Sequence, residues 1–358
     1  MMSKIPMYNH LKIIYSIFCI WLFLFLFDYF VYAKWKVHND TSFLLNELRK
    51  KGKMFRRSLP KYRDRGIVIP TLQKNIVNTM VLIRILKSYS VQLPITVCVT
   101  NSDTEEILTS HLSNQCEIMN ISEYTSLDET EMEGEQLNIM TLIYTKYNEV
   151  LLMHPNIILL NNPEVLFETE EYKSSGTFFW RREIPKGFFD KSRYQWINKI
   201  IPYEIETNPV LLKKSKSCLC GKIVCMNKNL HKKSLHKLYL LNKYWDIVYT
   251  YLDYGDTLWM GCEFAREDYQ LTSYNPGIIG NRTSLNLKGD RIYYLNYPSH
   301  HNIFIDKPIE NDTEYNDITF VHDHSISNKH ATKIDKDIEH KLNEYKKEYH
   351  KVMEFYVN

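Results

Sequence analysis

Apolar and polar residues are arranged along the first half of the chain so that strands and helices are predicted in turn. Four short apolar runs are typical of buried strands: 67–69, 93–99, 116–121 and 150–153. Apolar residues recur at helical spacing between the first two runs, from Ile76 to Leu86, and a second helix is predicted over 136–147, just before the last run. Alternating strands and helices predict an α/β fold with a mostly parallel central sheet.

The second half of the chain has a less regular pattern. An amphipathic helix is predicted from Leu235 to Tyr251, with an apolar face made by Leu238, Leu241, Trp245 and Val248. A final helix is predicted from Ile334 to Val352, because lysines and glutamates fill the face opposite its apolar residues. The acidic segment 123–135 is predicted to be a surface loop.

The N-terminal segment 13–33 is strongly apolar, and about 20 such residues span a bilayer. We therefore expect a short cytoplasmic tail at 1–12, a transmembrane signal anchor at 13–33 and a charged stem at 34–64. Residues 65–358 would then form one lumenal domain. A cleaved signal peptide is the alternative, but the apolar run is long and no clear cleavage site follows it.

Charge and cysteine usage narrow the class of protein. The 45 basic and 42 acidic residues give a net charge of +3, which is too balanced to indicate nucleic-acid binding. Six of the seven cysteines follow the apolar segment, a number compatible with disulfides in an oxidising compartment. The close spacing of Cys218, Cys220 and Cys225 does not match the usual zinc pattern. Four glycosylation sequons favour a lumenal domain: Asn39, Asn120, Asn281 and Asn311.

The segment 149–180 carries the most specific signal for chemistry. Its apolar run ends at Pro155, because proline cannot donate to a strand ladder. Ligands of open α/β sheets bind just beyond the carboxyl ends of the strands. His154 and Asn156 lie at such an end, two residues apart and on one side of an extended chain.

This segment resembles the fungal α-1,3-mannosyltransferase family of the Golgi, which carries Asp-x-Asp where this chain has His154-Pro155-Asn156. Further stretches resemble the same family in the same order: RGIVIPT at 65–71, LPITVCVTN at 93–101, CGKIVCMNKNLH at 220–231, YGDTLWMGCEFA at 254–265, NPGIIG at 275–280 and FVHDH at 320–324. The resemblance implies a GT-A-like nucleotide-sugar-binding fold. It also implies a single-pass type II protein of the Golgi membrane with a lumenal C-terminal domain.

The resemblance further implies the activity. It implies a hexosyltransferase that uses Mn²⁺ and transfers mannose from GDP-mannose to mannose-containing glycans on glycoproteins. The expected partners are the nucleotide-sugar, a glycan acceptor and other transferases. His154 and Asn156 are implied as metal ligands, in the place of the family's two aspartates. His322 and His324, in the late histidine motif, are implied as further metal ligands. Asp256 is implied as the residue that orients the acceptor or acts as a base, and Glu267 and Asp268 follow as further catalytic candidates on a predicted helix.

A second set of residues is expected to bind the donor. Pro70 and Thr71 end the first predicted strand, where a nucleoside commonly docks, and Lys74 and Arg84 could reach a phosphate. The resemblance adds four positions: Asn138, where the family has a lysine, Trp180, as a platform for a sugar or a core residue, and Gly277 and Gly280, in a tight turn.

The exchange of two carboxylates for His154 and Asn156 leaves the activity open. Each lost pair of unit charges at 4 Å amounts to about 4 kcal/mol at an effective dielectric of about 20, so metal binding should weaken strongly. One interpretation is a divergent enzyme. The other is a catalytically inactive protein of the same fold that binds a glycan or a partner enzyme in the secretory pathway. A transferase of another sugar is a third.

Overall fold

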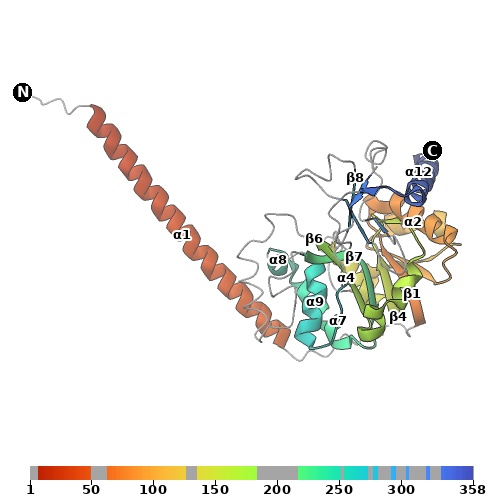
Figure 1. The fold of residues 1–358 in the computed structure, drawn as a ribbon. Coiled ribbons are helices and arrows are strands. Elements are labelled where there is room, and N and C mark those ends of the chain that lie inside the picture. Colours follow the sequence, from red (N-terminus) through yellow and green to blue (C-terminus); the bar gives the residue numbers. More distant parts are fainter. Residues whose placement is uncertain are drawn as a thin grey trace, which may run out of the picture.

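The structure is a computed structural model, drawn in Figure 1, that describes part of the 358-residue chain. It describes residues 7–49, 63–125, 135–183, 217–250, 254–272, 277–280, 292–295, 304–305, 320–322 and 332–357. His324 and most of the predicted acidic loop lie outside these residues.

A six-stranded sheet forms the centre of the molecule, in the order β3-β2-β1-β4-β7-β6. Four of its strands are parallel neighbours: β1 (Arg63–Pro70), β2 (Ile95–Val99), β3 (Glu117–Asn120) and β4 (Tyr147–Met153). The remaining two, β7 (Ser217–Asn227) and β6 (Thr177–Glu183), are antiparallel additions. The predicted α/β class and the four predicted strands are therefore confirmed.

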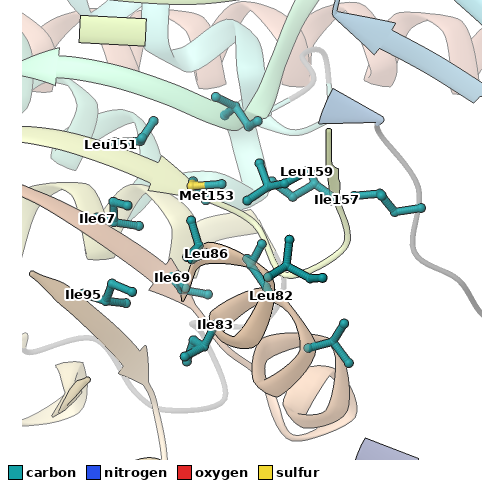
Figure 2. Close-up of a cluster of buried hydrophobic side chains, with 14 of the residues drawn as sticks. Ile67, Ile69, Leu82, Ile83, Leu86, Ile95, Leu151, Met153, Ile157 and Leu159 are labelled. Carbon is teal, nitrogen blue, oxygen red and sulfur yellow. The ribbon is translucent and has the colours of Figure 1, made fainter. Parts of the chain in front are cut away.

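Helices cover both faces of this sheet (Figure 1). One face is covered by α2 (Ile76–Ser88), α3 (Ser102–Leu112) and α12 (Lys336–Val357). Figure 2 shows Leu82, Ile83 and Leu86 of α2 beside apolar side chains of β1, β2 and β4. The other face is covered by α4 (Glu135–Tyr144), α7 (Lys232–Lys243) and α9 (Tyr254–Ala265).

The two helices predicted for the second half differ in outcome. The final helix is confirmed as α12, with Ile338, Leu342 and Tyr345 buried against the core. The helix predicted over 235–251 is interrupted, because α7 ends at Lys243 and a separate turn, α8 (Trp245–Val248), follows. Trp245 is 42% exposed, so its assignment to the buried face was wrong.

A second, antiparallel sheet was not predicted. Its strands run in the order β12-β11-β8-β9-β10-β5. They are β5 (Ile158–Leu159), β8 (Gly277–Gly280), β9 (Ile292–Leu295), β10 (Phe304–Ile305), β11 (Phe320–His322) and β12 (Thr332–Lys333). The tight turn predicted for Gly277 and Gly280 was wrong, because both glycines are strand residues, aligned with Tyr294 and Phe320.

Short helical turns join these elements. They are η1 (Gln73–Asn75), η2 (Ile121–Glu123), η4 (Pro163–Glu168) and α5 (Glu170–Ser175). The first of them, η1, connects the end of β1 to α2, so it lies at the carboxyl edge of the parallel strands.

A long N-terminal helix, α1 (Met7–Arg49), extends away from the domain in Figure 1. In the part of the chain that the structure describes, no helix is both long enough and apolar enough to cross a membrane. The last turns of α1 pack on the domain. Leu44 and Leu48 are buried there, Phe43 meets Tyr244 edge-on with ring centroids 5.1 Å apart, and Lys237 donates to the Leu48 carbonyl. The described part of the predicted stem is thus attached to the domain at its C-terminal end.

We expect Gly66→Ala to destabilise the fold by about 1–3 kcal/mol. A methyl group at this position of β1 would overlap the ring of Tyr147 on β4. That ring is fully buried, and its hydroxyl is paired with Thr96 Oγ1 at 2.8 Å, so it cannot swing away. Urea denaturation measures the loss of unfolding free energy.

The control for this substitution is a double-mutant cycle with Tyr147→Leu. Removing the ring should relieve the overlap, so Gly66→Ala should cost less in the Tyr147→Leu background than in the parent chain. An equal cost in both backgrounds would show that the ring is not the cause.

Candidate functional site

The carboxyl ends of β1 and β4 meet at one edge of the central sheet, which we call the ligand edge. Val68 of β1 is aligned with Leu152 of β4, and continuing this parallel register brings Pro70 beside His154. The backbone N–H of Thr71 donates to Cys98 at the end of β2, at 2.7 Å. The ends of these strands therefore lie side by side, as the sequence predicts.

His154 makes a hydrogen bond that determines its tautomer. Its Nδ1 accepts the backbone N–H of Asn156 at 3.1 Å. A backbone N–H can only donate, so Nδ1 carries no proton, and in the neutral ring the proton resides on Nε2. His154 is consequently a donor through Nε2.

The surroundings of His154 keep the ring neutral. Burial lowers the pKa of His154 to about 3, with the positive charges of Lys222 and Lys74 lowering it further in the same direction. At physiological pH the ring is therefore an uncharged N–H donor.

Asn156 is also engaged. Its Oδ1 accepts a hydrogen bond from Asn78 Nδ2, on α2, at 3.1 Å. The His154 ring is neutral, and the Asn156 amide carries no charge. Neither of the two predicted ligands therefore supplies the negative charge that would favour a divalent cation. Within the described residues, no group of three or more histidine, cysteine or acidic side chains is close enough to hold a metal ion. The residues present at this corner do not fit Mn²⁺.

The other predicted metal ligands are only partly described. His322 ends β11, which is separated from β5 by three strands of the second sheet, and its side chain lies outside the described residues. His324 lies outside them altogether. Their role in metal binding stays a prediction.

Lys222, which the sequence did not single out, lies beside His154. The backbone N–H of His154 donates to the Lys222 carbonyl at 2.7 Å, continuing the antiparallel pairing of β4 with β7. Facing residues of an antiparallel pair have their side chains on the same side of the sheet. Leu152 and Val224 point into the core under α4, α7 and α9, so His154 and Lys222, two residues further along, belong to that side.

Asn138 lies on this same side of the sheet. α4 is joined to β4 by two residues, so it runs back along the strand and begins near the ligand edge. Asn138 in its first turns is 1% exposed, and neither its Oδ1 nor its Nδ2 has a hydrogen-bond partner among the described residues. Such a buried, unpaired amide costs about 1–3 kcal/mol, and a ligand or a water that met it would remove this cost.

Asp256 lies in the first turn of α9 and is fully buried. Its Oδ1 accepts a hydrogen bond from the indole Nε1 of Trp259 at 3.0 Å. Gly261, later in α9, approaches Ser234 and Leu238 near the start of α7, so the two helices run in opposite directions. α7 begins at the edge of the sheet opposite the ligand edge, because it follows the end of β7. The antiparallel helix α9 therefore begins on the side of the ligand edge. The catalytic role of Asp256 stays a prediction.

Glu267 lies at the opposite edge of the sheet and caps a helix. Its carboxylate accepts the backbone N–H of Lys233 and of Ser234, at 3.3 and 2.9 Å, and the Ser234 hydroxyl at 2.6 Å. α7 follows the end of β7, which is aligned with the beginning of β4 at Glu149. Asp268 is adjacent and exposed. The structure therefore does not bring Glu267 or Asp268 together with His154, and the carboxylate of Glu267 is occupied by the start of α7.

The predicted donor-binding residues have structural contacts of their own. Thr71 is buried, with its hydroxyl paired to Thr79 of α2 at 2.9 Å, and Pro70 continues the pairing of β1 with β2. Trp180 is fully buried in the core, so it offers no face for a sugar to stack on. The prediction of Trp180 as a platform was wrong, and the alternative of a core residue is correct. Arg84 pairs with Glu348 of α12 at 3.6 Å.

The comparisons with known proteins relate part of this chain to mannosyltransferases. Residues 64–219 match the family described as "Mannosyltransferase putative". The "Putative alpha-1,3-mannosyltransferase MNN15" of Candida albicans is 22% identical over 169 residues, which cover 42% of this chain and 22% of the relative. The chain thus spans about a fifth of the length of that relative.

Two solved structures show a remote likeness. The mannosyltransferase Ktr4p of S. cerevisiae is 11% identical, with a TM-score of 0.32, over 65% of this chain and 72% of that one. The galactosyltransferase LgtC, in complex with donor and acceptor sugar analogues, is 10% identical, with a TM-score of 0.35, over 55% and 69%.

We expect Glu267→Ala to lower the unfolding free energy by about 0.5–2 kcal/mol, because the N–H groups at the start of α7 lose their acceptor. Binding of GDP, which the sequence predicts at the ligand edge, should not change. Denaturation with urea and calorimetry with GDP measure the two quantities.

Asp268→Ala is the matched control for this substitution, since Asp268 is the exposed neighbour and should cost less than about 0.5 kcal/mol. Weakened GDP binding by Glu267→Ala, without loss of stability, would return Glu267 to the site.

Proposed function

We propose, on the premise that this chain belongs through residues 64–219 to a fungal mannosyltransferase family, that it transfers mannose from GDP-mannose to mannose-containing glycans on glycoproteins. The observation that carries this proposal is the family match itself, which spans the strands β1 to β4 and the ligand edge between them. A fold of the GT-A type is part of the proposal.

The donor would lie along the ligand edge, with its diphosphate at the corner formed by His154 and Asn156. Open α/β sheets bind ligands at the carboxyl ends of their strands, and this corner lies between the neighbouring ends of β1 and β4. The unpaired amide of Asn138 is available to the sugar or the nucleotide from the side of α4. Asp256, directed to the same edge, would orient the acceptor hydroxyl or accept its proton.

The second candidate function is a non-enzyme that binds a glycan or a partner enzyme. The observation in its favour is the pair His154 and Asn156, neither of which is an acidic ligand. The two candidates differ in turnover, which a transfer assay measures directly.

We expect the full chain in detergent to convert GDP-mannose and a mannose-terminated glycan into GDP and an elongated glycan. Asp256→Asn should abolish this transfer and leave the melting temperature within a few degrees, since asparagine can still accept the hydrogen bond of Trp259 but carries no charge. Mass spectrometry of the glycan and a thermal melt provide the two measurements.

One outcome would count against this function, and another would count only against the role of Asp256. Absence of turnover together with absence of GDP and GDP-mannose binding would favour the non-enzyme. Full activity of Asp256→Asn would remove Asp256 from the site while leaving the transfer function standing.

We further propose a single-pass type II topology in the Golgi membrane, anchored by residues 13–33, with the C-terminal domain in the lumen and in contact with other transferases. The apolar segment and the sequons that follow it support this proposal. An epitope added after Asn358 should resist protease in sealed microsomes and become sensitive when detergent opens them. Digestion of the epitope in sealed microsomes would contradict the proposed topology.

A further inference from the structure

We propose that the ligand edge binds the diphosphate of the nucleotide-sugar with protein cations, Lys222 and Lys74, and the Nε2–H of His154, in the place where relatives with Asp-x-Asp would hold a divalent cation. This inference rests on the proposed function, because it concerns the same nucleotide-sugar site.

The first support is the hydrogen bonding of the corner. A metal ion needs a lone pair, and Nδ1 of His154 has given its lone pair to the backbone N–H of Asn156 at 3.1 Å. Turning the ring or shifting its proton to free a nitrogen would leave that partly buried N–H unpaired. The Oδ1 of Asn156 accepts a hydrogen bond from Asn78 at 3.1 Å, which occupies one of its two lone pairs, and this amide carries no negative charge. The same arrangement leaves Nε2–H as a donor, which suits a phosphate oxygen.

The second support is the sign of the local charge. Two lysines, Lys222 and Lys74, lie close enough to His154 for their charges to lower its pKa. Two aspartates at positions 154 and 156 would attract a divalent cation, whereas two ammonium groups repel one and attract a diphosphate. Lysine is a regular phosphate ligand in proteins, where it acts as a compact point charge.

The third support is the convergence of three separate elements on one point. His154 ends β4, Lys222 faces it from β7 through a backbone hydrogen bond of 2.7 Å, and Lys74 lies in η1, four residues beyond the end of β1. Continuing the pairing of β1 with β4 by two residues beyond Val68 brings Pro70 beside His154. The turn η1, which follows β1, therefore begins next to the same corner. Lys222 thus faces the histidine from β7, and Lys74 lies in the turn that follows β1.

Isothermal calorimetry on the full chain in detergent tests this inference with two probes, GDP and inorganic pyrophosphate. Each probe is titrated in EDTA and again with Mn²⁺. We expect the GDP affinity in EDTA to match that in Mn²⁺ within about twofold, because the protein itself supplies the positive charge. The affinity in EDTA should fall as salt is raised.

Two lysine variants and one control variant test which residues bind the probes. Lys222→Gln and Lys74→Gln should each weaken the binding of GDP and of pyrophosphate in EDTA by about tenfold. Lys74 is exposed, so its variant tests the inference even if Lys222→Gln fails to fold. The matched control is Lys233→Gln, an exposed lysine at the start of α7 on the opposite edge, which should bind both probes as the parent chain does.

The outcomes separate this inference from the proposed function. GDP binding that requires Mn²⁺, or that is the same in both lysine variants and the control, overturns the inference and leaves mannosyl transfer standing. Pyrophosphate binding in EDTA that depends on the two lysines, without GDP binding, supports the inference and contradicts the GDP-linked donor. Failure of both probes to bind overturns the inference and, with it, the assignment of this edge to a nucleotide-sugar.

Discussion

One hydrogen bond, from the backbone N–H of Asn156 to Nδ1 of His154, decides what the ligand edge can bind. It occupies the lone pair that a metal would need and fixes the proton on the other nitrogen, so the ring faces a ligand as a donor. Burial and two nearby lysines keep the ring uncharged by lowering the pKa of His154 to about 3. The corner is therefore suited to anions.

The rest of the structure holds this corner in position. β4 lies between β1 and β7; the register of β7 brings Lys222 opposite His154, and Lys74 lies in η1, which follows β1. The core that fixes these registers is apolar on both faces, and Tyr147 filling the space above Gly66 aligns the beginning of β4 with β1. At the opposite edge, Glu267 caps α7, the helix against which α9 packs at Gly261.

The sequence was sufficient for the parallel strands and for the ligand edge, because periodicity and a strand-ending Pro155 are local signals. It was insufficient for Lys222, because only the antiparallel register of β7 brings that residue beside His154. Glu267 was misassigned for a related reason: its position on the chain, close to Asp256, gives no information about the edge at which it lies. Trp180 and the two glycines of β8 were misassigned because burial and strand pairing depend on distant partners.

A crystal structure of the protein with GDP and Mn²⁺, measured at the manganese absorption edge, tests the central claim most directly. If the corner binds the diphosphate without a metal ion, the diphosphate should lie within hydrogen-bonding distance of Lys222 Nζ and His154 Nε2. No anomalous peak should then appear between His154 and the phosphates. A strong anomalous peak coordinated by His154 or Asn156 and bridging the diphosphate would contradict it.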